Sequence, residues 1–115
     1  MNTTIWHNPR CGTSRKVLDA IRARGVEPAI VLYLETPPSA GELKAVCKDA
    51  GISPRDLVRR KEPSFKELGL DGAKVTEAAL IAAMHQHPIL IERPVVKTKK
   101  GTRLCRPPEK LAEIL

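Results

Sequence analysis

Two hydrophobic periods alternate along the first third of the chain. Residues 3–7 are β-branched and aromatic before Asn8-Pro9, as in a short strand. From Ser14 to Arg24, apolar residues recur at helical spacing, and Gly25 stands where a helix often ends. Residues 29–34 are continuously apolar, which is typical of a central strand covered on both faces. Strand, helix and strand predict a βαβ unit with parallel strands and a right-handed crossover.

The middle of the chain has mainly the helical period. Ser39 to Glu42 form a capping-box pattern before apolar positions spaced for a helix that Gly51 ends. Ser53-Pro54 predicts the start of a short helix, and residues 62–75 are expected to be irregular. Thr76 is then expected to cap another helix, whose apolar face contains Leu80, Ala83 and Met84.

The last third returns to strand patterns. Residues 89–91 are expected to begin a strand that leads into 92–97, and a turn at 99–101 joins it to 102–105 as a hairpin. Pro107-Pro108 then opens a short closing helix. A βαβ unit followed by ββα is the skeleton of the thioredoxin fold. We therefore predict an α/β protein, a single thioredoxin-like domain over residues 1–115, with a mixed four-stranded sheet and a helical insertion at about 36–86.

Cys11 lies in the turn between the first strand and the first helix. Unpaired N–H groups and the positive end of a helix dipole favour a thiolate there, as do nearby cations such as Arg, Lys or protonated His. The alternative is a buried structural cysteine, but the flanking residues are polar and turn-forming. Ser14 makes the motif CxxS, which cannot form a disulfide. Cys47 lies on an apolar helix face and Cys105 in the distant hairpin, so an external thiol is the expected resolving group.

Composition narrows the classes of partner. The formal net charge of +7, from 20 Lys+Arg against 13 Asp+Glu, favours an anionic partner. Trp6, Tyr33 and Phe65 are too few to form a stacking platform for single-stranded nucleic acid, so none is expected as a partner. No apolar run approaches the roughly 20 residues that span a bilayer, and no signal-peptide pattern is present, so a cytoplasmic protein without membrane contact is expected.

The cysteines and histidines of the sequence do not have the spacing of metal ligands. The three cysteines are isolated, and His85 and His87 point to different sides of a helix. We therefore expect no metal site, and we expect these two histidines to lie on the surface or at a helix end.

Four segments together resemble the glutaredoxin-coupled arsenate reductases, and the resemblance runs from about residue 3 to residue 115. They are His7-Asn8-Pro9-x-Cys11-Gly12-Thr13-Ser14-Arg15, Leu32-Tyr33-Leu34-Glu35-x-Pro37-Pro38-Ser39, His87-Pro88-Ile89-Leu90-Ile91-x-Arg93-Pro94 and Gly101-Thr102-Arg103-Leu104-Cys105-Arg106-Pro107.

The resemblance implies a role for each matching position. Cys11 would be the nucleophile, His7 and Ser14 would favour its thiolate, and Arg59, Arg93 and Arg106 would hold the arsenate oxyanion. Arg60 is the alternative to Arg59 if the register shifts by one. The bond before Pro94 is expected to be cis. The resemblance also implies glutathione as co-substrate, glutaredoxin as partner and no bound cofactor; we expect a monomer.

Physical chemistry supports an oxyanion site of this kind. Arsenate is a tetrahedral anion, and guanidinium groups bind such oxygens in pairs while staying protonated. Each arginine also has an alternative role that involves no substrate. Arg59 could belong to a solvated basic run, and Arg93 or Arg106 could form an ion pair with Glu92 or Glu109. Cys105 is expected to be a packed strand residue.

Two other functions remain open from the sequence. One is a redox-responsive regulator that resembles the Spx type and binds RNA polymerase, although those regulators typically carry CxxC where this chain has CxxS. The other is a general glutathione-dependent thiol oxidoreductase, which would not require an anionic substrate.

Overall fold

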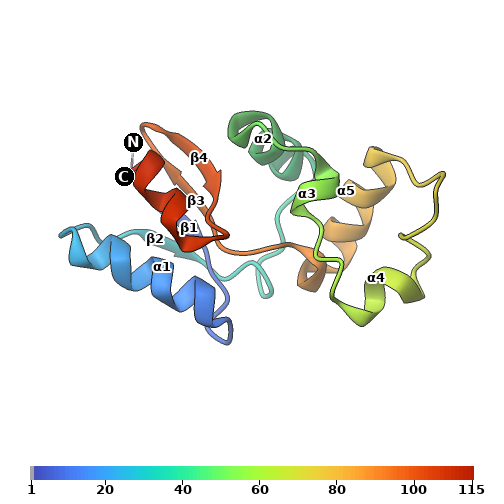
Figure 1. The fold of residues 1–115 in the computed structure, drawn as a ribbon, viewed down its shortest axis with the longest axis horizontal. Coiled ribbons are helices and arrows are strands. Elements are labelled where there is room, and N and C mark those ends of the chain that lie inside the picture. Colours follow the sequence, from blue (N-terminus) through green and yellow to red (C-terminus); the bar gives the residue numbers. More distant parts are fainter. Residues whose placement is uncertain (1) are drawn as a thin grey trace. The chain divides into compact units, whose positions relative to one another are not determined.

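A four-stranded mixed sheet forms the centre of one unit of the computed structural model, which describes residues 2–115 (Figure 1). Its order is β2-β1-β3-β4. β1 (Thr4–Trp6) pairs in parallel with β2 (Ala29–Val31) and antiparallel with β3 (Val95–Thr98), which pairs antiparallel with β4 (Gly101–Leu104). This arrangement confirms the predicted thioredoxin-like combination of βαβ and ββα.

Two helices complete the hydrophobic core of this unit. α1 (Gly12–Ala23) and the 3₁₀ helix η2 (Pro108–Glu113) pack together and share a core with Ile5 of β1 and Val96 of β3. The α1 residues in the core are the predicted Val17, Leu18 and Ile21. Burying each large aliphatic side chain contributes about 1.5–3 kcal/mol. The core therefore holds α1, and the turn before it, against the central strand.

The prediction of a central strand at residues 29–34 was wrong. β2 has only three residues, it is an edge strand, and Ala29 and Ile30 are exposed. The backbone then turns, with the Glu35 N–H donating to the Leu32 carbonyl, and Tyr33 is fully buried. A continuous apolar run does not by itself show how many neighbouring strands it has.

Residues 37–92 form the second compact unit, whereas residues 2–36 and 93–115 form the first. Its elements are α2 (Ala40–Ala50), α3 (Pro54–Leu57), α4 (Pro63–Glu67), α5 (Glu77–Gln86) and the 3₁₀ helix η1 (Pro88–Leu90). α5 packs against both α2 and α3. The observed unit is thus longer at its C-terminal end than the predicted insertion, while the assignment of 1–115 to one domain stays a prediction.

The helix starts in this unit follow the sequence signals. Ser39 and Glu42 form the predicted capping box, and the Thr76 hydroxyl accepts from the Ala79 N–H. Ser53 and Asp56 form a second capping box that the sequence prediction had not included. Gly51 ends α2 with a φ of 68°, a left-handed conformation that glycine adopts at little cost.

Two local predictions in this unit were wrong. Residues 62–75 are not wholly irregular, because Pro63 begins the short helix α4. Residues 89–91 are not a strand: Pro88 begins η1, and Ile91 makes only an isolated antiparallel bridge with Val58. The fixed φ of proline suits the first residue of a helical turn, and this local preference prevails over the apolar pattern.

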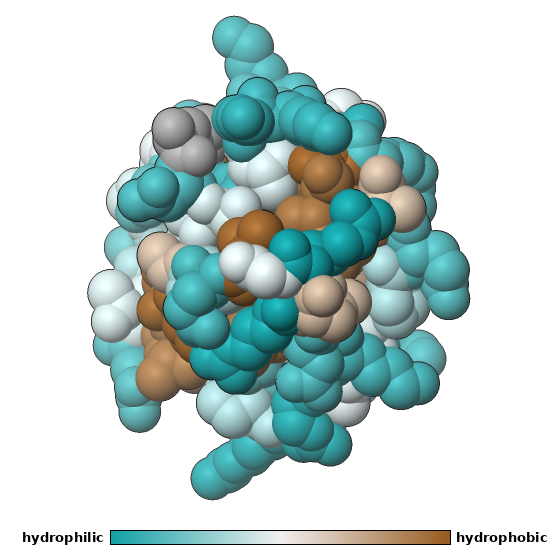
Figure 2. Space-filling model, turned by 90° about the vertical axis from the view of Figure 1, so that its left-hand side faces the viewer, coloured by the Kyte–Doolittle hydropathy of each residue, from teal (hydrophilic) through white to brown (hydrophobic). Residues whose placement is uncertain are grey.

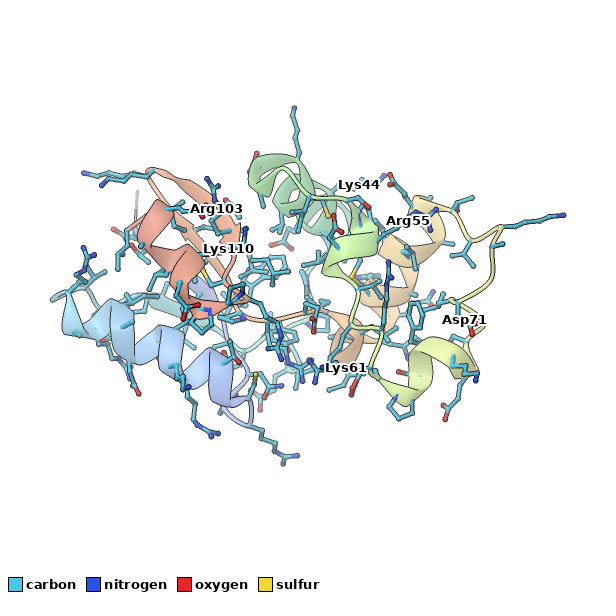
Figure 3. All side chains as sticks on the ribbon, viewed as in Figure 1. Lys44, Arg55, Lys61, Asp71, Arg103 and Lys110 are labelled. Atoms are coloured by element: carbon cyan, nitrogen blue, oxygen red, sulfur yellow. The ribbon has the colours of Figure 1, made fainter. Side chains whose placement is uncertain are left out.

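Polar and charged side chains cover most of the face shown in Figure 2, with apolar residues visible between them. Figure 3 labels two basic side chains of the first unit, Arg103 of β4 and Lys110 of η2. Among residues 2–115, no helix is long and apolar enough to cross a membrane.

Candidate active site

Cys11 is the N-cap residue of α1. Its backbone is extended, its N–H donates to the Asn8 carbonyl at 3.0 Å, and its carbonyl accepts from the Arg15 N–H. α1 therefore begins at Gly12, two residues before the predicted start. The thiol is partly exposed and lies beside the N–H groups of Thr13 and Ser14. A helix N-terminus of this kind stabilises an anion.

Arg93 and Arg106 lie beside the same thiol. Nη1 of Arg106 is 3.8 Å from Sγ of Cys11 and donates to the Arg93 carbonyl at 3.2 Å. Arg93 precedes β3 and Arg106 follows β4, so the antiparallel pairing of these strands brings the two arginines together. Arg93 is buried, with 7% of its surface exposed. The sheet thus holds two cations near Cys11.

The backbone at this corner contains two cis peptide bonds. The bond between Arg93 and Pro94 is cis, as predicted. The bond between Arg106 and Pro107 is also cis, which the sequence analysis did not predict.

The environment lowers the pKa of the Cys11 thiol. Burial by itself raises this pKa, but hydrogen bonds from the Ser14 N–H, the Arg106 and Arg93 guanidinium groups and the Thr13 N–H outweigh it. All of these groups favour the thiolate, which is the nucleophilic form of cysteine. The structure thus supports a reactive rather than a structural Cys11.

His7 and Ser14 are linked beneath the cysteine turn. Nδ1 of His7 lies 2.6 Å from Oγ of Ser14, and this hydroxyl also accepts from the Asn8 N–H at 3.1 Å. Ser14 is fully buried. Burial lowers the pKa of His7, and the positive charges of Arg22 and Arg15 lower it further. The lowered pKa favours the neutral imidazole of His7, whose Nδ1 lies against the Ser14 hydroxyl.

Asn8 is a structural contributor that the sequence analysis did not single out. It is buried, its carbonyl accepts from Cys11 and its side-chain Oδ1 accepts from the Arg10 N–H at 3.0 Å. The signal was available, because asparagine before a turn often hydrogen-bonds to backbone two residues later.

Arg59 and Arg60 belong to the second unit. The Arg59 guanidinium pairs with Glu92 at 2.9 Å and with Glu62 at 3.8 Å. Glu92, which was considered as a partner of Arg93, thus forms an ion pair with Arg59. Nη2 of Arg60 donates to the Arg55 carbonyl at 3.3 Å, and its side chain lines a hollow with Arg55 and Phe65. The labelled Arg55 in Figure 3 marks this part of the unit.

The other two cysteines lack such an environment. Burial raises the pKa of Cys47 to about 11 and that of Cys105 to about 12. Both thiols are buried, and Cys105 belongs to the core formed by α1 and η2. Among residues 2–115, no group of three or more His, Cys, Asp or Glu side chains is arranged to hold a metal ion.

The fold and the surroundings of Cys11 define a protein of the thioredoxin-like class with one cysteine at the N-terminus of its first helix. The chain belongs to the ArsC family, which it matches over residues 6–114.

Three relatives illustrate this membership. The chain is 55% identical to an arsenate reductase of Escherichia coli K12, over 99% of this chain and 81% of the relative. It is 47% identical to YfgD, an uncharacterized protein of the same strain, over 96% of this chain and 94% of the relative. A solved arsenate reductase from Vibrio cholerae superposes with a TM-score of 0.95 at 43% identity, covering 100% of this chain and 98% of that one.

Proposed function

We propose that this protein reduces arsenate to arsenite through the Cys11 thiolate, with glutathione and glutaredoxin supplying the electrons. The observation that carries the proposal is the placement of Arg93 and Arg106 beside a thiol whose pKa is lowered. Relatives named arsenate reductase, at 50–55% identity over nearly the whole chain, support this substrate.

The arginines address the main electrostatic obstacle. Arsenate and a thiolate are both anions, so their approach is unfavourable unless cations are already in place. Guanidinium groups remain protonated and form paired hydrogen bonds with oxyanions. In the proposed step, the sulfur of Cys11 bonds to arsenic, and one arsenate oxygen leaves as water after it is protonated.

Reduction then requires a second thiol. Its sulfur attacks the sulfur of Cys11, a disulfide bond forms, and the electron pair of the sulfur–arsenic bond remains on arsenic, which is then As(III). The two electrons come from the two thiols. Glutathione acts as this second thiol, and the glutaredoxin thiol then reduces the mixed disulfide and restores Cys11.

Arg59 is proposed as a third substrate-binding arginine because of its position in the family pattern. In the structure its guanidinium is engaged by Glu92 and Glu62. Replacement by lysine, which keeps one charge but loses the planar donor arrangement, would raise the KM for arsenate if Arg59 binds it. An unchanged KM would restrict Arg59 to a structural ion pair.

The proposal is tested by arsenate-dependent oxidation of glutathione in the presence of glutaredoxin. We expect turnover with the wild-type chain and none with Cys11→Ser. A rate that does not depend on arsenate, together with reduction of a neutral mixed disulfide, would favour a general thiol oxidoreductase. Recovery of RNA polymerase in a pull-down, without enzymatic activity, would favour a regulator.

A further inference from the structure

A cavity of about 330 Å³ lies beside the turn that precedes Cys11. Two segments of the chain line it, one with His7, Asn8, Pro9 and Arg10 and the other with Leu32, Leu34 and Glu35. All of these residues belong to the first unit. The volume is at the lower end of the range for small-molecule sites, so it suits part of a small ligand rather than a protein segment.

The charges in this cavity are not paired with each other. Arg10 and Glu35 carry opposite charges, yet within residues 2–115 neither side chain forms a hydrogen bond or ion pair with another side chain. Both residues are exposed, so both charges are available to a ligand. Leu32 and Leu34 add apolar surface to the cavity, and Leu34 is 39% exposed.

The position of the cavity relates it to the cysteine. Arg10 directly precedes Cys11, and the Cα atoms of consecutive residues are about 3.8 Å apart. Because Arg10 lines the cavity, a ligand bound there lies beside the residue that carries the thiol. Neither Cys47 nor Cys105 is suited to react with Cys11, because both are buried and their pKa values are raised.

We propose that this cavity binds the reducing thiol, and that it recognises an end group carrying both an ammonium and a carboxylate, as the γ-glutamyl end of glutathione does. Glu35 would hold the ammonium and Arg10 the carboxylate, which share one carbon atom, and the two leucines would contact the methylene groups that join this carbon to the peptide bond. The proposal rests on the proposed function only in that an external thiol resolves Cys11.

Reaction with a disulfide tests this site without arsenate. The Cys11 thiolate attacks one sulfur of glutathione disulfide, bonds to it, and releases the other half as a thiolate, so no further oxidant is required. The rate at which the Cys11 mixed disulfide forms is measured by mass spectrometry. Bis(2-hydroxyethyl) disulfide, which is uncharged, provides the comparison and reports whether each variant still presents a reactive Cys11.

We expect Arg10→Gln and Glu35→Gln each to lower the rate with glutathione disulfide about threefold, because each loses one exposed charge contact. The rate with the uncharged disulfide should not change. Lys16→Gln and Glu67→Gln are the matched controls, since they remove the same charges from exposed positions outside the cavity.

The Glu35 variant separates local binding from the general field of the protein. Glutathione disulfide is anionic, so loss of a negative charge would speed its approach if only net charge mattered. The proposal predicts the opposite change. A faster rate in Glu35→Gln, or equal changes with both disulfides, would overturn it.

This result is independent of the arsenate assay. A preference for glutathione disulfide in a chain that does not reduce arsenate would support the cavity and reject the proposed function. If the chain reduced arsenate but the two cavity variants changed the rate with neither disulfide, the proposed function would be supported and the cavity proposal rejected.

Discussion

Nη1 of Arg106 lies 3.8 Å from Sγ of Cys11, although the two residues are 95 positions apart in the chain. The contact exists because β4 ends next to the start of β3, whose neighbour β1 leads into the cysteine turn. The electrostatic environment of the thiol therefore depends on the folded sheet, in addition to the local helix N-terminus.

Arg106→Leu should raise the pKa of Cys11, because it removes a hydrogen bond that favours the thiolate. The rate of iodoacetamide alkylation, measured against pH, should shift its midpoint upward, and the rate at pH 7 should fall by about tenfold for a lost charged hydrogen bond of about 1.5 kcal/mol. Arg103→Leu is the matched control, since Arg103 pairs with Glu113 instead. An identical profile for both variants would show that Arg106 does not stabilise the thiolate.

Ser14→Ala should destabilise the fold as well as slow alkylation. It leaves the Asn8 N–H and the buried His7 nitrogen without their shared partner. Burial of an unsatisfied polar group costs about 1–3 kcal/mol, which a urea denaturation series would measure. Ser64→Ala, a change of the same kind at a partly buried position in α4, should have a much smaller effect. Equal losses of unfolding free energy in the two variants would show that the Ser14 hydroxyl has no special structural role.

His7 should make folding stability dependent on pH in the acidic range. Its pKa is lowered in the folded chain, so below its ordinary value of about 6.5 the unfolded chain binds more protons than the folded one. Stability should therefore fall as pH drops from about 6.5 toward the folded pKa. His7→Gln should remove this component of the pH dependence. If the difference in folding stability between the wild-type chain and His7→Gln stayed constant across this pH range, the lowered pKa of His7 would be contradicted.

Arg59 and Glu92 should be coupled energetically. Both side chains are 20% exposed, whereas Arg22 and Glu27, which form a pair of similar geometry, are 46% and 68% exposed. A double-mutant cycle with Arg59→Ala and Glu92→Ala should give about 1–2 kcal/mol of coupling in unfolding free energy, whereas the same cycle on the exposed pair should give a much smaller coupling. Equal coupling in the two cycles would show that the partial burial of Arg59 adds nothing.

Cys47 and Cys105 should not react in the folded chain. Their pKa values of about 11 and about 12 leave almost no thiolate at pH 7. Brief treatment with iodoacetamide should therefore label one site, Cys11, which peptide mass spectrometry can verify. Labelling of Cys105 at a similar rate would mean that the core around it opens readily.

Local signals in the sequence predicted much of the frame that positions the site. The strand, turn and helix around Cys11 follow from residue types in one short stretch of the chain. The helix caps at Ser39 and Thr76 likewise follow from residues close to each of them in sequence. The resemblance to a known family supplied Arg93 and Arg106 as candidates, and strand pairing explains why they meet.

The remaining differences arise where tertiary neighbours decide the outcome. The run at 29–34 is apolar, but only the assembled sheet shows that β2 is at an edge. Residues 89–91 read as a strand until Pro88 starts a helical turn. The Arg59–Glu92 pair joins residues 33 positions apart, so no local pattern could indicate it.

The central claim is that the sulfur of Cys11 transfers electrons to arsenic. Its most direct test is chromatographic separation of arsenate and arsenite after incubation with glutathione and glutaredoxin, in parallel with measurement of glutathione disulfide. The proposed chemistry predicts one arsenite for each disulfide formed, and neither product with Cys11→Ser. Formation of disulfide without arsenite, or equal arsenite from the Cys11→Ser variant, would contradict it.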